Sequence, residues 1–402
     1  MHTYGLIVIG SGPAGVSAVA AYDKAGGEGP VLLLTADPTA PYERPPLTKA
    51  SLRADATPEP TPLVEQGGAT DLDLRLGMPV SHLDLDRRVV EAGGESFRYE
   101  RLILAPGAQP LPLPSAEAGA DLHVLRSFAD LERLAQSAGH ARTAVVIGSG
   151  FIGCEAAISL ALRGLDVTLV SQESAPQVDR LGERAAALIA DLLEGHGVSL
   201  RLGVEVATVQ APRTIHLSDG TTLAPDLVLA ALGVEPSTHF LDGSALQMHE
   251  GRVVVDEHLA ATVDGVWAAG DAARAMHAVA GRPIPVEHWG DALAMGEVAG
   301  RNAAGERAAW QTVPGFWSEL GEHQLKYVAW GDGHDEVVVD EAPGRLTVWY
   351  GRGGLLAGVL TYNADDDLER GQGLIHQGAE LAAGMRGDRP ESEDDFSEAK
   401  EG

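Results

Sequence analysis

The chain has 402 residues, of which 45% are hydrophobic and 49 are glycine, and its formal net charge is −29. This length accommodates two or three domains with substantial cores, and the many glycines suit an α/β protein with tight turns. The excess negative charge disfavours nucleic acid and anionic membranes as partners. No apolar run approaches the length of a membrane span, and residues 1–3 lead directly into the first predicted strand, so we expect a soluble, cytoplasmic protein.

Residues 5–15, GLIVIGSGPAG, predict the first element. An apolar run typical of a buried strand ends in Gly10-x-Gly12-x-x-Gly15 and continues into a helix. The first glycine permits the turn, the second lets the backbone approach a pyrophosphate, and the third lets the helix pack on the strand, while free N–H groups face the anion. A single copy of this pattern could equally be an ordinary strand-to-helix turn.

The pattern occurs twice, because residues 144–153 read AVVIGSGFIG. Each copy is followed by a hairpin signal, Gly93-Gly94 or Asp219-Gly220, and then by an apolar strand, at residues 102–107 or 227–233. One strand–helix module is therefore used twice. Two such modules predict two dinucleotide cofactors.

Between the two copies, residues 31–34 predict a second strand, after which Asp37 is the candidate acid for a cofactor ribose, about 20 residues past the glycines. Asp37 could equally begin a turn with Pro38. The next segment, residues 41–49, reads PYERPPLTK. It is too rich in proline for a regular element and too apolar for an exposed linker.

Residues 41–49 resemble the PYxRPPLSK stretch of the ferredoxin reductase family of FAD-dependent pyridine-nucleotide oxidoreductases, which includes rubredoxin and putidaredoxin reductases and apoptosis-inducing-factor-like proteins. The resemblance implies that this segment lines the flavin and that Lys49 lies near the reactive flavin nitrogen. Thr48 replaces the family's usual serine. The alternative is a surface loop with a solvated lysine.

Two further charged residues carry the resemblance. Arg126 lies in a segment similar to the family's LRTxxDA, whose arginine approaches the flavin cofactor, although an ion pair with Asp130 is an equal alternative. Glu155 occupies the place of a family glutamate two residues past the third glycine. A buried carboxylate needs a partner, and the resemblance supplies Lys49.

The second module ends its strand, residues 167–170, at Ser171, where an NAD-using family member usually carries an acid. An NADP site would instead need arginines for the 2′-phosphate, and none lies between residues 167 and 176. The absence of arginine favours NADH over NADPH.

Residues 265–271 end in Gly270-Asp271 and resemble the family's second FAD signature, whose aspartate binds the ribityl chain; a turn-forming aspartate is the alternative. Residues 287–289, Glu-His-Trp, and the helix predicted at 292–303 resemble the EHWxxAxxQG segment under the isoalloxazine, with Met295 in place of glutamine. No second ligand stands at metal-binding spacing from His288.

The last part of the chain predicts antiparallel strands at residues 337–339, 346–350 and 355–360, with turns at Pro343-Gly344 and Gly353-Gly354, and a helix at 368–385. Phe316-Trp317-Ser318 resembles the family's FWSDQ signature, which implies that Trp317 borders the flavin and the electron exit. As a bare observation it could equally be a core residue.

The resemblance implies an α/β fold with two Rossmann-like dinucleotide-binding domains, one inserted in the other, plus a C-terminal α+β interface domain. We expect the FAD domain at residues 1–112 and 225–305, the nicotinamide domain at 113–224, the interface domain at 306–386 and an acidic disordered tail at 387–402.

The implied site has three sets of residues. The catalytic pair is Lys49 and Glu155. The residues assigned to FAD are Gly10, Gly12, Pro13, Ala14, Gly15, Asp37, Arg44, Lys49, Val80, Ala105, Gly107, Arg126, Gly270, Asp271, Glu287, His288, Trp289 and Trp317. The residues assigned to NAD are Gly148, Gly150, Phe151, Ile152, Gly153, Glu155, Ser171 and Gly233.

The resemblance implies an enzyme, a monomer or homodimer, that takes hydride from NADH and passes single electrons from FAD to a ferredoxin or similar small iron–sulfur protein. Alternatives are NADH oxidase or small-quinone reductase activity, or a redox-sensing flavoprotein with low turnover. The single cysteine, Cys154, excludes a disulfide relay within the chain; it is either a packed side chain or a thiolate activated by a helix N-terminus. For an acidic ferredoxin we expect a basic docking patch formed by Arg44, Arg301, Arg307 and Lys326, and binding that weakens with salt.

Overall fold

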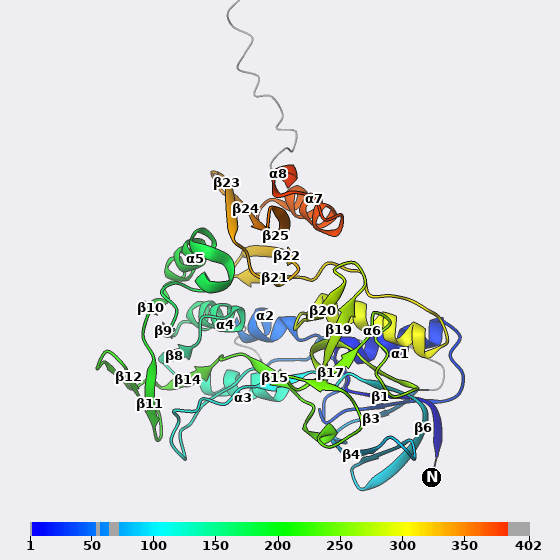
Figure 1. The fold of residues 1–402 in the computed structure, drawn as a ribbon. Coiled ribbons are helices and arrows are strands. Elements are labelled where there is room, and N and C mark those ends of the chain that lie inside the picture. The colour runs from blue at the N-terminus through cyan, green and yellow to red at the C-terminus, as the bar shows by residue number, and fades with distance from the viewer. Residues whose placement is uncertain (1, 54–56, 64–71, 385–402) are drawn as a thin grey trace, which may run out of the picture.

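The structure is a computed structural model that describes residues 2–53, 57–63 and 72–384 (Figure 1). The tail predicted at 387–402 lies outside the described residues. In the part of the chain that the structure describes, every helix is too short or too polar to span a bilayer.

The first sheet is built around β1, the apolar run of the first glycine motif. Its strand order is β3-β2-β1-β6-β5-β4, with β1, β2, β3 and β6 parallel and β4 and β5 antiparallel. The bounds are β1 Thr3–Ile9, β2 Val31–Leu34, β3 Leu72–Arg75, β4 Val80–Asp84, β5 Val89–Ala92 and β6 Glu95–Leu104. The predicted turn at Gly93-Gly94 joins β5 to β6.

The sheet is completed by a strand from far along the chain. β18, Val266–Ala268, pairs in parallel with the last residues of β6, with Val266 opposite Leu102. The second glycine module lies between these strands in sequence but forms a sheet of its own. The predicted insertion of one Rossmann-like domain in the other is therefore confirmed, whereas the domain boundaries at residues 112, 224 and 305 stay a prediction.

The second sheet is fully parallel, with strand order β10-β9-β8-β14. Helices α3, α4 and α5 belong to the same module. The bounds are α3 Phe128–Ala138, β8 Thr143–Ile147, α4 Phe151–Leu162, β9 Asp166–Val170, α5 Val178–Gly195, β10 Ser199–Arg201 and β14 Leu227–Ala230. Strands β11 Val206–Gln210, β12 Thr214–Leu217 and β13 Thr222–Leu223 form a small antiparallel sheet beside it, with the predicted turn at Asp219-Gly220 between β12 and β13.

The C-terminal part forms an antiparallel sheet in the order β21-β22-β25-β24-β23. The bounds are β21 Gly315–Leu320, β22 His323–Ala329, β23 Glu336–Ala342, β24 Arg345–Arg352, β25 Leu355–Tyr362, α7 Asp365–His376 and α8 Leu381–Gly384. The three predicted strands and both predicted turns are confirmed. The single helix predicted at 368–385 is wrong, because Gly378 takes a φ of +64° and separates α7 from α8.

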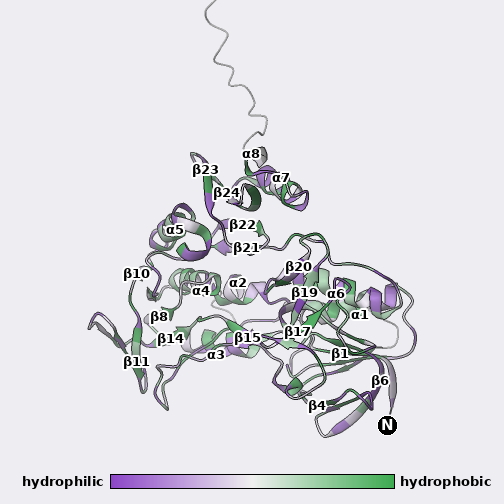
Figure 2. Ribbon diagram, viewed as in Figure 1, coloured by the Kyte–Doolittle hydropathy of each residue, from purple (hydrophilic) through white to green (hydrophobic). Residues whose placement is uncertain are grey.

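The remaining elements connect these sheets. They are α1 Pro13–Lys24, α2 Ala50–Arg53, β7 Ala108–Pro110, β15 Val234–Pro236, β16 Met248–His249, β17 Arg252–Val255, β19 Ala273–His277, β20 Arg282–Pro285, α6 Trp289–Ala303 and the 3-10 turns Pro45–Thr48, His239–Leu241 and Gly270–Ala272. In Figure 1 the first sheet with α1 and α6 lies beside the second module, and the C-terminal sheet with α7 lies across the top. Figure 2 shows mainly hydrophobic colour on β1 and mixed colour with much purple on α7.

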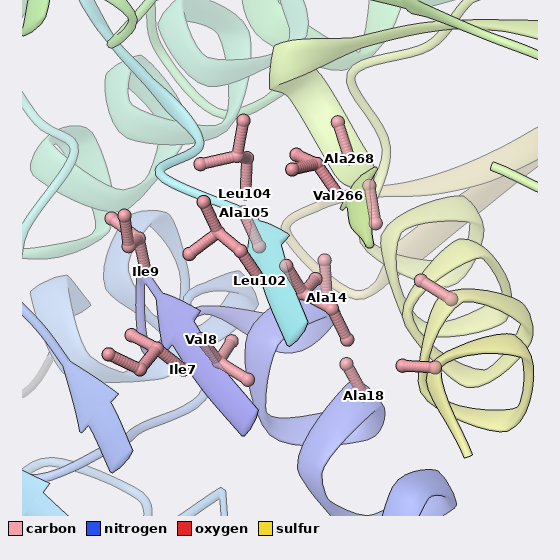
Figure 3. Packing of buried hydrophobic residues seen from close by; sticks show 14 of the residues in the cluster. Ile7, Val8, Ile9, Ala14, Ala18, Leu102, Leu104, Ala105, Val266 and Ala268 are labelled. Carbon is pink, nitrogen blue, oxygen red and sulfur yellow. The ribbon is translucent and has the colours of Figure 1, made fainter. Parts of the chain in front are cut away.

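Two glycines let helix α6 approach helix α1 closely. A Cβ atom on Gly296 would lie 2.2 Å from the Ala14 carbonyl oxygen, and one on Gly300 would lie 2.2 Å from that of Ala18. Figure 3 shows Ala14 and Ala18 on α1, in the space between the central strands and α6. This contact brings the N-terminal end of α6, which begins at Trp289, towards the first glycine motif.

Candidate functional site

A cavity of about 700 Å³ lies where the two glycine modules and the C-terminal sheet meet. Most of the predicted site residues line it, although they come from all parts of the chain. Those on the lining are Gly10, Gly12, Pro13, Ala14, Asp37, Arg44, Lys49, Val80, Ala105, Gly107, Arg126, Gly150, Phe151, Ile152, Glu155, Gly233, Gly270, Asp271, Glu287, His288, Trp289 and Trp317. Gly15, Gly148, Gly153 and Ser171 lie outside the lining.

The third glycine of each motif acts through packing rather than through the cavity. A Cβ on Gly15 would lie 1.9 Å from the Gly10 carbonyl oxygen, and one on Gly153 would lie 2.1 Å from that of Gly148. In contrast, a Cβ on Gly12 would meet nothing within 4 Å. Gly12 therefore leaves open space at the cavity wall, as close approach of a diphosphate requires.

Helices α1 and α4 both begin at the cavity without a side-chain cap. Their N-cap residues are Gly12 and Gly150, so the first N–H groups of each helix have no side-chain acceptor. Helix α3 differs, because Ser127 and Asp130 form a complete capping box there. Free N–H groups at two helix starts suit two pyrophosphates, and thus the residues present fit two dinucleotides.

A buried ion pair joins the two modules at the cavity. Lys49 Nζ lies 2.7 Å from Glu155 Oε2, and their side chains are 10% and 5% exposed. Lys49 Nζ also donates to the Pro45 carbonyl oxygen at 3.0 Å. The predicted contact is present, and it connects the proline-rich segment after β2 with helix α4.

Glu155 accepts three further hydrogen bonds. Thr48 Oγ1 donates to its Oε2 at 2.5 Å, and Ser318 Oγ and the Glu319 N–H donate to its Oε1 at 2.7 and 3.0 Å. The carboxylate thus binds donors from the first module and from the C-terminal sheet. Ser318 was not assigned to the site from sequence. Its place in the Phe-Trp-Ser motif is the signal that could have identified it.

Arg126 and Asp271 form the second charged pair of the lining. Arg126 Nη2 lies 2.5 Å from Asp271 Oδ2, and its Nε donates to the Ala108 carbonyl oxygen at 3.1 Å. The alternative ion pair of Arg126 with Asp130 is wrong. Arg126 contacts that carboxylate through its backbone N–H and not through its guanidinium, and the ion pair of Asp130 is with Arg133. The guanidinium of Arg126 thus binds a carboxylate that is distant in sequence instead of the one that local spacing suggested.

Asp37 is held by its neighbours at the end of the first module's second strand. Its Oδ1 accepts from the Thr39 N–H at 3.0 Å, and its Oδ2 accepts from the Tyr42 hydroxyl at 2.7 Å. Asp37 therefore both forms a turn and lines the cavity, and the two interpretations of this residue are compatible.

The carboxylate of Glu173 lies close to Ser171, from which it is two residues away in sequence. Ser149 Oγ donates to Glu173 Oε2 at 2.6 Å and lies 2.7 Å from Ser171 Oγ, and the Gln177 N–H donates to Glu173 at 3.2 Å. These contacts fix the Glu173 carboxylate beside the second glycine loop. In the described residues no cation pairs with it.

Aromatic rings and one arginine close the cavity between the second module and the C-terminal sheet. The Phe316 ring lies 4.5 Å from that of Phe151 and 4.8 Å from that of His288. Arg180 lies over the Phe316 ring at 5.1 Å. Burial, and then the Arg180 charge, lowers the pKa of His288 to about 4, so the imidazole is neutral near pH 7. Sequence analysis missed Arg180 and Phe316; nothing local distinguishes Arg180 from Arg184, the other arginine of α5.

Comparison with known proteins identifies the family. Residues 4–292 match the family described as pyridine nucleotide-disulphide oxidoreductase, and residues 315–392 match the one described as reductase C-terminal. The chain belongs to the pyridine nucleotide-disulphide oxidoreductase family. Membership makes it an oxidoreductase and implies FAD and NAD(P)H as cofactors, in agreement with the two uncapped helix starts.

Several relatives cover nearly the whole chain. Rhodocoxin reductase of Rhodococcus erythropolis is 31% identical over 375 residues, which are 90% of this chain and 87% of that protein. A ferredoxin–NAD(P)+ reductase of a Sphingomonas species is 30% identical over 95% of each chain. The crystal structure of a covalent putidaredoxin reductase–putidaredoxin complex superposes with a TM-score of 0.87 at 27% identity, covering 94% of each chain.

The prediction of a basic docking patch is wrong, because each of the four cations expected to form it is engaged within the chain. Arg44 lines the cavity and donates to the Arg126 carbonyl oxygen at 2.7 Å. Lys326 lies opposite Trp317 on the neighbouring strand, but its ammonium binds Asp365 at 2.7 Å. The other two cations are engaged at the C-terminal end of α6: Arg301 with Glu297 and Glu306, and Arg307 with His258.

Cys154 is a packed side chain rather than a reactive thiolate. It is fully buried, its Sγ lies 3.3 Å from the Ser149 carbonyl oxygen, and burial raises the pKa of the thiol. Within the described residues no cluster of metal-ligating side chains is present either.

Asp291, on the first turn of α6, gives a prediction about pH. Its side chain is 2% exposed, has one hydrogen bond, from the Gly315 N–H at 3.2 Å, and burial raises its pKa from 3.8 to about 7. The folded state therefore binds an extra proton between about pH 4 and 7, so stability falls as pH rises through this window. We expect Asp291→Asn to raise the free energy of unfolding at pH 8, by an amount on the order of 4 kcal/mol, and to have little effect near pH 4.

The measurement is urea unfolding of the FAD-loaded protein at both pH values. Asp366→Asn, an exposed position on α7, is the matched control and should show no pH-dependent difference. An equal effect of Asp291→Asn at pH 4 and pH 8 would contradict the proposed ionisation.

Proposed function

We propose that this protein is an NADH-dependent flavoprotein reductase that passes single electrons to a small iron–sulfur protein of the ferredoxin type. The observation that carries the proposal is the buried Lys49–Glu155 pair in a cavity shared by two dinucleotide motifs. The relatives named as rhodocoxin and ferredoxin reductases support the class of acceptor.

In this proposal the first module and β18 hold FAD. Gly10 and Gly12 face its pyrophosphate, Asp37 its ribose and Asp271 its ribityl chain. The bound flavin supplies the chemistry that the protein lacks, because it accepts a hydride and releases electrons one at a time. Trp289 and Trp317 border the ring system from α6 and β21.

Lys49 has the main electrostatic role. Its ammonium is fixed by Glu155 and the Pro45 carbonyl oxygen, and it is nearly excluded from water. A fixed positive charge in a dry site favours negative charge as it develops nearby, without the cost of reorganising solvent. Glu155 orients the ammonium, and its hydrogen bonds with Ser318 and Glu319 hold α4 against the C-terminal sheet.

The second module is proposed to bind NADH in preference to NADPH. Glu173 occupies the region where the 2′-position of the adenine ribose is expected, beyond the end of β9. A carboxylate accepts hydrogen bonds from a ribose hydroxyl, but it repels a phosphate. Ser149 and Gln177 hold that carboxylate in place, which strengthens the discrimination.

Electrons are proposed to leave beside Trp317, whose side chain is 37% exposed on the cavity lining. Cys154 is the single cysteine of the chain and is buried in the second module, so no thiol relay is available. An external acceptor must therefore approach the flavin edge directly.

One observation favours a second candidate function. Lys326, the cation opposite Trp317 on the sheet, is neutralised by Asp365, so an acidic protein gains little attraction there. A small uncharged acceptor such as a quinone, or oxygen, would not need that attraction. Reduction of such an acceptor is the alternative.

A cognate ferredoxin distinguishes the two functions. We expect NADH-dependent reduction of cytochrome c to rise strongly when a ferredoxin from the same genome is added, and to increase modestly with ionic strength, because salt screens the repulsion between two acidic proteins. If no ferredoxin or rubredoxin raises turnover above the rate with oxygen or quinone alone, the alternative replaces the proposal.

The role of the ion pair is tested by removing either partner. Lys49→Ala and Glu155→Gln should slow stopped-flow reduction of the flavin by NADH about ten-fold or more, since each removes or misplaces the fixed charge. FAD retention should change much less. Lys326→Ala, which breaks an exposed pair on the C-terminal sheet, is the control and should leave the flavin reduction rate unchanged. Wild-type rates in both pair variants would refute the role.

Coenzyme preference is tested through Glu173. Wild-type kcat/KM should be about ten-fold higher with NADH than with NADPH, and Glu173→Gln should narrow the difference by raising kcat/KM for NADPH, because it removes a like charge from the phosphate. Glu183→Gln, at an exposed position on α5, should keep the wild-type ratio. A wild-type preference for NADPH would show that another cation completes the site.

A further inference from the structure

Arg180 lies on a short turn that is held at both ends. Before it, Gln177 takes a left-handed conformation with φ of 61°, and its Nε2 donates to the Ser149 carbonyl oxygen at 3.0 Å. After it, Gly182 interrupts the helix with φ of 76°, and the Leu181 carbonyl oxygen accepts from the Tyr350 hydroxyl at 2.8 Å. The turn is therefore tied to the second glycine loop on one side and to the C-terminal sheet on the other.

The guanidinium of Arg180 lines the cavity and contacts three rings. It lies 5.1 Å from the Phe316 ring and 6.0 Å from the Phe151 ring, and its Nη2 lies 3.4 Å from His288 Nε2. These contacts come from three different parts of the fold. They place the positive charge at the cavity lining, although Arg180 itself is an exposed residue.

This charge is not neutralised by its surroundings. Among the described residues no carboxylate lies within 4 Å of the Arg180 guanidinium. Arg184, one turn further along α5, differs because its Nε and Nη2 both donate to the Glu341 carboxylate. His288 is neutral near pH 7 and supplies no negative charge. A fixed positive charge therefore faces the cavity beside Phe151, the residue that follows Gly150 in the second motif.

We propose that Arg180 is a charge-selecting, positioning residue of the nicotinamide subsite, which weakens the binding of NAD+ relative to the reduced coenzyme. The inference rests on the proposed oxidation of NADH, but it is independent of the final acceptor. It concerns the charge of the nicotinamide ring, which changes in the reaction.

The charge change follows from the chemistry. The C4–H bond of the dihydronicotinamide breaks, and the hydride, one proton with two electrons, passes to a flavin, which is reduced. The nicotinamide ring is neutral before this step and carries one positive charge after it. Arg180 therefore repels the product ring but not the substrate ring, while its interaction with the diphosphate that both forms share cancels in the comparison.

The size of the effect follows from Coulomb's law. Two unit charges several ångströms apart in a partly solvated cavity repel by an amount that corresponds to roughly a five- to ten-fold change in affinity. Faster loss of NAD+ frees the site for the next coenzyme. Arg180 thus favours turnover over a long-lived product complex, which argues against a purely sensing role.

The experiment compares binding of two coenzyme forms to the oxidised, FAD-loaded protein. The probes are NAD+ and 1,4,5,6-tetrahydro-NAD, whose neutral ring does not donate hydride, and the readout is the dissociation constant by titration calorimetry. Arg180→Gln should lower the ratio of the NAD+ constant to the tetrahydro-NAD constant about five-fold or more, mainly by tightening NAD+ binding. Arg180→Lys keeps the charge and should keep the ratio near that of the wild type.

Arg184→Gln is the matched control, because it removes a cation of the same helix that does not line the cavity, and it should leave the ratio unchanged. FAD content and thermal midpoint establish that each variant is folded. An unchanged ratio in Arg180→Gln overturns the inference, and so does an equal loss of affinity for both probes, which would place Arg180 at the shared diphosphate. Failure of NADH to reduce the flavin would instead refute the proposed function. The ratio of the two dissociation constants could still be measured in that case, so the two failures are distinguishable.

Discussion

The burial of Glu155 constrains the whole arrangement of this protein. A carboxylate that is almost removed from water is costly unless charge and hydrogen bonds compensate it. Glu155 has Lys49 and Thr48 from the first module and Ser318 and Glu319 from the C-terminal sheet. Four donors from two other parts of the chain can converge on one carboxylate only when all three parts are in register.

The packing around that point is consistent with the same requirement. The hydrophobic cluster that contains Leu47 and Leu52 of the first module also contains Ile158 of α4 and Leu320 and Tyr350 of the C-terminal sheet. Apolar contact thus supplies the driving force for assembly, while the carboxylate selects the geometry. On the other side of the cavity, the glycines of α6 allow its close contact with α1 and so set the position of Trp289.

The charges of the cavity differ in how far they are compensated. Lys49 is paired with Glu155, and Arg126 is paired with Asp271, so the electric field of each cation is largely cancelled beyond its immediate surroundings. Arg180 has aromatic and imidazole neighbours instead of a carboxylate. Paired charges orient a bound group with little field at a distance, whereas an unpaired one acts on whatever charge enters the cavity.

The sequence by itself determined the two glycine motifs and the hairpins at Gly93-Gly94 and Asp219-Gly220. These features depend on local periodicity, on turn chemistry and on backbone space that only glycine leaves. The resemblance of the motifs to the family implied the insertion of one domain in the other and the pairing of Lys49 with Glu155.

Only the tertiary structure decided which partners the other side chains take. Arg126 binds Asp271, 145 residues away, instead of the nearby Asp130, and Lys326 is neutralised by Asp365 instead of facing a partner. Arg180 gave no local signal at all, because its role depends on Phe151, Phe316 and His288 from three separate elements. The physical reason is that a backbone pattern is a property of neighbouring residues, whereas the net charge at a point in a cavity depends on every element that reaches it.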